Sequence, residues 1–197
     1  AAPVHDAAAP VAEVDELLKG VPGMAALVGR HEFVAAISAR LDQLEARIAD
    51  RELELEAGVG FSPEALEAAN ASLLAMRDAV WAVRRDRLRT AAAVADFVGL
   101  DAGEAAIAGY LAVQQALSAI DRMEVRGRDS AGVHVFVWGH GLDADDPSVR
   151  AALADRARDP LFQSGSVRWA GPCLGFVYKA AAEIGELGDN VKALRAA

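Results

Sequence analysis

The 197-residue sequence predicts an α+β protein with a helical first half and a mixed second half. Two patterns lead to this prediction. Through residues 30–57 and 63–97 apolar side chains recur at intervals of three and four, the period of a helix that buries one face. Residues 133–138 instead alternate between valines and larger side chains, as a strand does. We therefore assign residues 1–100 to an all-helical region and residues 101–197 to a region of helices and strands.

Composition restricts the class of protein. The chain is 53% hydrophobic and 25% charged, and its formal net charge of −9 argues against nucleic-acid binding, which needs a basic face. Its first residues lack the basic and unbroken apolar segments of a signal peptide, and no stretch approaches the ~18 apolar residues that span a bilayer. Cys173 is the only cysteine, so no internal disulfide is expected. We expect a cytoplasmic protein without a membrane or nucleic-acid partner, and the start without Met indicates a piece of a longer chain.

The N-terminal segment predicts little regular structure. Residues 1–10 are rich in alanine and proline, which is typical of a loose end. A short helix should follow over residues 11–20 and end at Gly20, because glycine commonly terminates helices. The Val-Pro-Gly of residues 21–23 then reads as a turn.

Two long helices should form a hairpin. Gly58 and Gly60 end the first one, Ser62 caps the second, and Pro63 occupies its first turn. Helices joined by so short a turn pack antiparallel. We expect their charged outer faces to be solvated. The apolar stripes are Phe33, Ile37, Leu41, Leu44, Ile48 and Leu55 on the first helix, and Leu66, Leu73, Met76, Val80, Val83 and Leu88 on the second.

The second half should open with a helix and a buried strand. Asp101 and Glu104 form a D-x-x-E capping box for a helix that ends near Met123. In the strand at residues 133–138 both alternating sets of side chains are largely apolar. We therefore expect this strand to be covered on both faces.

A second strand and two more helices complete the prediction. Asp146 and Pro147 should start a short helix that ends near Ala157. The segment at residues 173–181 reads as a second strand, and a last helix should be capped by Asp189 or Asn190. Two strands alone are marginally stable in water, so we expect the sheet to continue outside this chain.

A charged loop between the helix and the first strand carries the main motif. The segment from Glu124 to Val135, EVRGRDSAGVHV, resembles the R-G-x-D-S-A-G segment of class II glutamine amidotransferases. A second segment from Leu187 to Ala197, LGDNVKALRAA, is similar to the L-G-x-V-x-x-L segment of the same family. The covered region is about residues 101–197. Within the family the loop looks most like that of the glucosamine-6-phosphate synthases, also called glutamine–fructose-6-phosphate aminotransferases.

The resemblance implies a fold, a reaction and partners. The fold would be part of the four-layer αββα sandwich of N-terminal-nucleophile hydrolases, with residues 1–100 as a helical insertion. The resemblance also implies that the strands at residues 133–138 and 174–179 are antiparallel neighbours. The reaction would be hydrolysis of the glutamine side-chain amide, with ammonia passed to a sugar-phosphate isomerase domain of the same polypeptide for amino-sugar biosynthesis. Expected partners are glutamine, a sugar phosphate, the rest of the polypeptide and further copies in a homo-oligomer. No cofactor is implied.

The resemblance also assigns residues in the loop. Arg126 would lie beside the N-terminal cysteine nucleophile in a supporting catalytic role, although an arginine there can equally brace the turn by pairing with Asp129 or a carbonyl. Gly127 would let the backbone approach the substrate closely. Asp129 and Ser130 can bind local backbone N–H groups, and Gly132 allows entry into a buried strand. These last three residues are expected to shape the loop.

Several positions depart from the family pattern. The family's nucleophile is an N-terminal cysteine whose own amino group acts as base, whereas residue 1 is Ala1. This chain alone should therefore lack glutaminase activity, and we interpret Cys173 as a small buried apolar residue. Val125 and Arg128 stand where glucosamine-6-phosphate synthases carry tyrosine. The alternative hypothesis is a catalytically silent relative whose helical hairpin is an interaction module.

Three other motifs appear coincidental or structural. Residues 167–171, VRWAG, resemble part of the family's glutamine-carboxylate segment but lack its His-Thr and precede the second match, so we interpret them as coincidence. The arginines of residues 84–89, RRDRLR, spread around a helix and predict no phosphate site. A metal site at His134, His140 and the aspartates of residues 143–146 is conceivable, but those aspartates are better explained as a turn and a helix cap. No metal is assigned.

Overall fold

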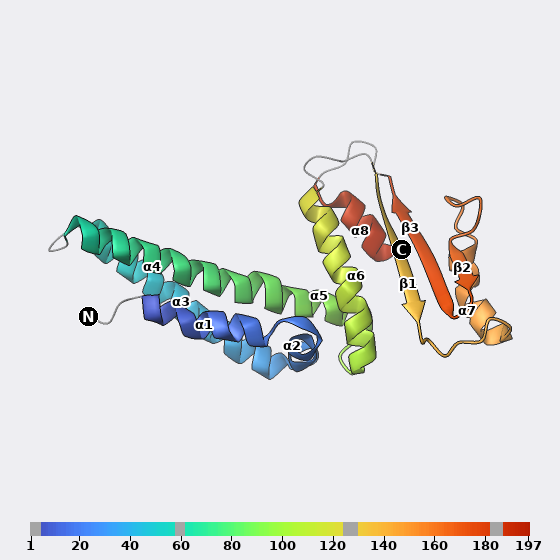
Figure 1. Cartoon of the computed structure of the whole chain (residues 1–197), viewed down its shortest axis with the longest axis horizontal. Coiled ribbons are helices and arrows are strands. Elements are labelled where there is room, and N and C mark those ends of the chain that lie inside the picture. The colour runs from blue at the N-terminus through green and yellow to red at the C-terminus, as the bar shows by residue number, and fades with distance from the viewer. Residues whose placement is uncertain (1–4, 58–61, 124–129, 182–186) are drawn as a thin grey trace. The chain divides into compact units, whose positions relative to one another are not determined.

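The computed structural model describes residues 5–57, 62–123, 130–181 and 187–197. The protein is α+β, as expected, and divides into two compact units. We call residues 1–114 the helical unit and residues 115–197 the sheet unit (Figure 1). The division falls within helix α6 (Glu104–Met123), whereas the sequence placed the domain boundary just before that helix.

The expected hairpin is confirmed as the centre of the helical unit. Helix α3 (His31–Glu56) packs against α4 (Pro63–Trp81). The two are antiparallel, because the ion-pair partner that comes later in the second helical segment binds a residue that comes earlier in α3. Arg77 binds Glu52 at 2.6 Å, and Arg84, two turns further, binds Asp42 at 2.7 Å. The predicted cap is also present, since the Ser62 hydroxyl accepts the N–H of Ala65 at 3.2 Å.

The second long helix contains a π-helical turn. Helix α4 continues through η1 (Ala82–Leu88) into α5 (Arg89–Val98). The buried residues Met76, Val80 and Val83 follow the α-helical period, but the next one, Leu88, lies five residues further on. A π turn accommodates one extra residue. It therefore keeps the apolar stripe facing the core on both sides of η1.

The N-terminal segment is more helical than expected. Helix α1 (His5–Leu17) includes residues 5–10, which we had predicted to be loose, and helix α2 (Gly20–Leu27) includes residues 21–23, which we had predicted to be a turn. Packing explains both corrections: α1 lies along α4 and η1, and α2 buries Met24 and Leu27 at 2% exposure each. Local propensity is a weak guide where such burial is available.

Close approach of two helices requires glycine at residue 23. A Cβ atom built there would lie 2.2 Å from the backbone carbonyl of Leu18, so any larger residue would force the start of α2 away from the end of α1. The core of the helical unit is one cluster of buried side chains that includes residues from α1 through the first half of α6. The unit thus buries its apolar stripes against one another.

Among its described residues, the sheet unit holds three antiparallel strands in the order β1–β3–β2 (Figure 1). Strands β1 (Ala131–Trp138) and β3 (Cys173–Ala180) are neighbours, which confirms the pairing expected from the sequence. Strand β2 (Val167–Ala170) was missed: it covers the segment that we had interpreted as a coincidental motif, and it forms a tight hairpin with β3. A third strand inside the chain weakens the argument that the sheet must continue outside it.

Three helices belong wholly or partly to this unit. They are the second half of α6, α7 (Pro147–Ala157) and α8 (Asp189–Ala196). The expected capping box of α6 is wrong, because the helix begins at Glu104 and Gly103 supplies the first carbonyl, which accepts the N–H of Ile107. Asp146 caps α7 as predicted, accepting the N–H of Ser148 at 2.7 Å.

The sheet has one buried and one exposed face. Val137 lies opposite Leu174 and Trp138 opposite Cys173, so the two members of each pair share a face. Leu174 is 2% exposed, and α8 packs on β1 and β3. Phe136 and Trp138, in contrast, are 52% and 64% exposed. The expectation that β1 is covered on both faces is therefore wrong for the described residues of this chain.

Candidate functional site

The motif-bearing loop joins the end of α6 to the start of β1. Arg126, Gly127 and Asp129 lie outside the described residues, whereas Ser130 and Gly132 lie within them. Ser130 is exposed immediately before β1, and Gly132 is the second residue of that strand. A Cβ atom at Gly132 would lie 3.1 Å from the carbonyl oxygen of Tyr178 on β3, so a side chain there would press on the neighbouring strand.

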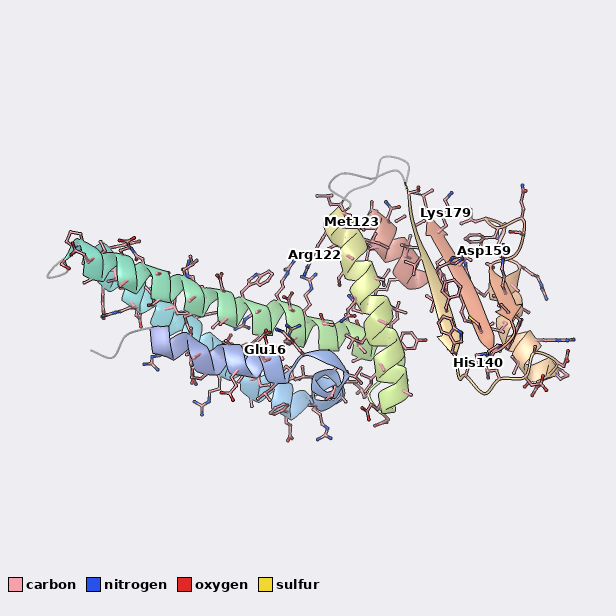
Figure 2. The ribbon with its side chains drawn as sticks, in the orientation of Figure 1. Glu16, Arg122, Met123, His140, Asp159 and Lys179 are labelled. Carbon is pink, nitrogen blue, oxygen red and sulfur yellow. The ribbon has the colours of Figure 1, made fainter. Side chains whose placement is uncertain are left out.

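The second matching segment lies beside the helix that leads into this loop. Gly188 precedes α8 in a left-handed conformation, with φ of +92°, and a Cβ atom there would lie 3.8 Å from a carboxylate oxygen of Asp121. Asp121 is in the last turn of α6, next to Arg122 and Met123 (Figure 2). The end of α6 and the start of α8 are therefore in contact, and both flank the entry to the loop.

Helix α8 begins differently from the prediction. We expected Asp189 or Asn190 as its cap, but the N-cap is Gly188, whose carbonyl accepts the N–H of Lys192 at 2.9 Å. Glycine adopts the left-handed conformation at little cost, which explains its place here. Asn190, in the first turn, is 1% exposed, so its amide belongs to the interior of the unit.

The exposed face of the sheet carries a row of aromatic rings. His134, Phe136 and Trp138 follow one another along β1, with ring centroids 5.2 Å and 5.9 Å apart. Phe136 also crosses to β3, where its ring lies 3.5 Å from the position of a Cβ atom at Gly175. Sequence reasoning treated these rings as buried. The alternation with valine did indicate that they share one side of the strand.

An arginine anchors the segment between β1 and β3 to the sheet. The Arg156 guanidinium lies 4.2 Å from the centre of the Tyr178 ring and binds Asp159 at 2.8 Å. It also donates to the carbonyl of Val177, and its own carbonyl accepts the hydroxyl of Ser166. These contacts hold α7 against the part of β3 that extends beyond β2. No local pattern of residues indicated this cluster in advance.

The residues considered for a metal site have structural contacts. His140 Nδ1 accepts the N–H of Leu142 at 3.0 Å, and its ring meets the edge of Trp169 at 5.4 Å between centroids. Asp143 accepts the N–H of Asp145 at 2.9 Å. Hydrogen bonds from the hydroxyl and the N–H of Ser148 hold the pKa of Asp146 below its usual value. Among the described residues, no group of three or more His, Cys, Asp or Glu side chains could hold a metal ion.

The arginine-rich segment and the cysteine also have structural surroundings. Arg84 binds Asp42 and Glu45, and Arg87 forms a two-pronged pair with Asp15 at 2.9 Å and 3.2 Å. These two guanidinium groups therefore join helices of the same unit. Cys173 is half-buried at the start of β3.

Comparison of the chain with protein families, curated proteins and solved structures finds no match. Within the part of the chain that the structure describes, no helix is long and apolar enough to cross a membrane.

Proposed function

We propose that the sheet unit is part of a glutamine-hydrolysing amidotransferase domain of the class II type, with the helical unit inserted into it. The domain would supply ammonia to a sugar-phosphate aminotransferase or isomerase domain of the same polypeptide, as in glucosamine-6-phosphate synthases. Both the resemblance of the loop and its structural setting support this family, and glutamine hydrolysis by the full-length protein would distinguish the proposed function from that of a silent relative.

One observation carries the proposal. Strand β1 begins with the last two residues of the R-G-x-D-S-A-G match and is the antiparallel neighbour of β3, and the second match opens a helix that packs on both strands. The two matches are separated by more than fifty residues, yet Gly188 of one lies beside Asp121, just before the other. The second match therefore lies beside the helix that leads into the first, as expected if both belong to one domain.

The exposed aromatic face is consistent with this function. In an αββα sandwich each sheet carries helices on one face and the other sheet on the opposite face. Here α8 packs on β1 and β3, while Phe136 and Trp138 on the other face are largely exposed. A second sheet would cover these rings and bury apolar surface, which is favourable by about 25 cal/mol per Å². In this proposal the remainder of the polypeptide supplies that second sheet and the cysteine nucleophile.

The proposal assigns roles to residues of the loop. Arg126 supports catalysis from beside the nucleophile, and Gly127 allows the backbone to approach glutamine. Asp129 and Ser130 shape the loop. Gly132 has no side chain, which allows β1 to lie close to the carbonyl of Tyr178 on β3. Cys173 takes no part, because it lies within β3 and its amino group is in a peptide bond, so it cannot act as an N-terminal nucleophile.

The decisive experiment substitutes Arg126 in the full-length protein. Arg126→Ala should reduce glutamine-dependent product formation by well over tenfold, which is about 1.4 kcal/mol or more of transition-state stabilisation. Product formation from free ammonia should persist, because that reaction would use the other domain. Arg122→Ala, four residues earlier in the last turn of α6, is the matched control and should leave both activities near their original rates.

Two results would contradict the proposal. If Arg126→Ala reduced both activities equally, Arg126 would only maintain the fold. If the full-length protein released no glutamate from glutamine, the catalytically silent alternative would be favoured.

A further inference from the structure

The outer side of α4 carries two large apolar side chains that the helical unit does not bury. Leu74 is 60% exposed and Trp81 is 55% exposed, although Leu73 and Val80 beside them are in the core. Residues seven apart lie on the same side of a helix, two turns from each other. Leu74 and Trp81 therefore form one apolar stripe on the side of α4 that faces away from the core.

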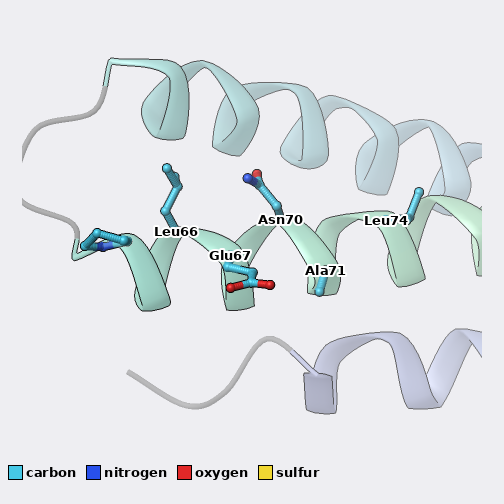
Figure 3. A pocket seen from close by; sticks show the side chains of 6 residues that line it. Leu66, Glu67, Asn70, Ala71 and Leu74 are labelled. Carbon is cyan, nitrogen blue, oxygen red and sulfur yellow. The ribbon is translucent and has the colours of Figure 1, made fainter.

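Two shallow hollows extend this stripe along the helix. One, of about 490 Å³, is lined by α4 alone, from Pro63 through Asn70 to Leu74 (Figure 3). The other, of about 630 Å³, runs from Leu74 to Trp81 and includes Ile48 of α3. Leu74 lines both, so the hollows form a continuous surface about five turns long. A surface of this form can receive another helix.

Charge along the same side of the helix changes sign from one end to the other. Glu67 lies two turns before Leu74, and Arg85 lies about one turn after Trp81. Between the two apolar residues, Arg77 and Asp78 stand next to each other. The sequence of properties is thus acidic, apolar, mixed, apolar and basic. If a second copy of this helix lies antiparallel to the first, its basic end faces the acidic end of the first, and the apolar residues of the two copies face each other.

We propose that the outer side of α4 is a docking surface for a second copy of this chain, with the two α4 helices antiparallel. A two-fold axis near Arg77 and Asp78 places Leu74 of each copy against Trp81 of the other. The same axis brings Glu67 of each copy towards Arg85 of the other, and Asp78 towards Arg77, which also binds Glu52 of its own chain. An interface of this kind uses the same patch on both subunits, which is the commonest arrangement in homo-oligomers.

The expected association is weak. Only two Leu74 and two Trp81 side chains form the apolar centre. One pair of helices buries less than about 1,200 Å² of surface, and interfaces of this size are typical of transient complexes. The charged pairs at the rim contribute mainly register and specificity. The proposal concerns the helical unit only, so its failure would leave the proposed glutaminase function untouched.

Sedimentation velocity of the 197-residue chain tests the proposal. Over about a hundredfold range of concentration, mass action should shift the wild type from its 20.6 kDa monomer towards a dimer. Trp81→Glu should weaken this association at least tenfold without loss of helical circular dichroism. Leu53→Glu is the matched control, because Leu53 is a 66% exposed leucine on α3 and lies off the proposed surface. It should associate like the wild type.

A charge exchange tests the antiparallel register. Glu67→Arg or Arg85→Glu alone places like charges together and should weaken the dimer severalfold, whereas the double variant should restore it. Residues 67 and 85 are five turns apart in one chain, so only contact between copies can explain such a restoration. A monomer at every concentration would overturn the proposal and leave the surface to a different protein. Equal effects of Trp81→Glu and Leu53→Glu, or a double variant weaker than both singles, would also overturn it.

Discussion

The helical unit and the sheet unit bury their apolar residues to different extents. The described part of the helical unit has one continuous core of 17 buried hydrophobic residues, drawn from the segment that runs from α1 to α6. The described part of the sheet unit has only four, Leu117, Leu174, Ala180 and Leu194. Aromatic rings that could extend this small core stand on the exposed face of the sheet instead. The described helices of the first unit thus pack around a core of their own, whereas the sheet of the second unit leaves one aromatic face exposed.

This difference indicates where each unit obtains its stability. Burial of apolar surface is the dominant favourable contribution to folding. The helical unit gains it from contacts among its own helices. The sheet unit gains it in part from α8, and the polar and cation–aromatic contacts around Arg156 add a contribution of a different kind. Substitutions in the two units should therefore differ in size and in kind.

The largest effect is expected from a cavity in the helical core. Leu27→Ala removes a side chain that is 2% exposed in α2, and such truncations cost about 3 kcal/mol of unfolding free energy. Leu53→Ala, at a 66% exposed leucine of α3, should change the unfolding free energy by less than about 0.5 kcal/mol. Amide hydrogen exchange can assign the loss: protection should fall in α1–α4 and remain unchanged in β1 and β3. A uniform loss across both units would contradict the view that the helical unit is stable on its own.

A smaller effect is expected at the arginine that anchors α7 to the sheet. Arg156→Lys keeps the charge but loses the planar group that stacks on Tyr178 and reaches the carbonyl of Val177. We expect a loss of about 1.5 kcal/mol, measured by urea denaturation, because one hydrogen bond and most of one cation–aromatic contact are removed. Arg150→Lys provides the control, since that arginine is 65% exposed on the same helix. If both substitutions cost the same, the cluster around Arg156 does not stabilise the sheet unit.

The sequence predicted the helical hairpin well because periodicity and capping are local properties. The stripes of α3 and α4, the Ser62 cap and the Asp146 cap each depend on neighbouring residues only. Pairing of β1 with β3 was also predicted, but through the family resemblance and not through the residues themselves. The incorrect predictions concern segments whose secondary structure depends on contacts with residues far away in the sequence. Residues 21–23 are helical because Met24 and Leu27 are buried, and no local pattern contains that information.

The candidate site was predicted only in part for the same reason. Strand β2 is four residues long and exists through its hairpin with β3, so its sequence shows little of a strand pattern. The exposure of Phe136 and Trp138 depends on which layers surround the sheet. Alternation of apolar residues shows that a face is apolar, but it does not show whether another part of the chain covers that face. The contact between Gly188 and Asp121 joins segments far apart in the sequence and required coordinates.

The smallest effect in this chain is expected at the exposed aromatic row, and it tests the comparison most directly. Trp138 is 64% exposed and Trp138→Thr keeps strand propensity, so the unfolding free energy of the 197-residue chain should change by less than about 0.5 kcal/mol. Val137→Thr, one residue away on the covered face, should cost about 1 kcal/mol because it buries a hydroxyl. In the longer protein that the proposed function implies, the order should reverse, since a second sheet over the aromatic row would make Trp138→Thr cost about 3 kcal/mol. If Trp138→Thr stayed neutral there, measured by the same denaturant titration, the aromatic face would remain in water and the sheet unit would not be one half of a sandwich.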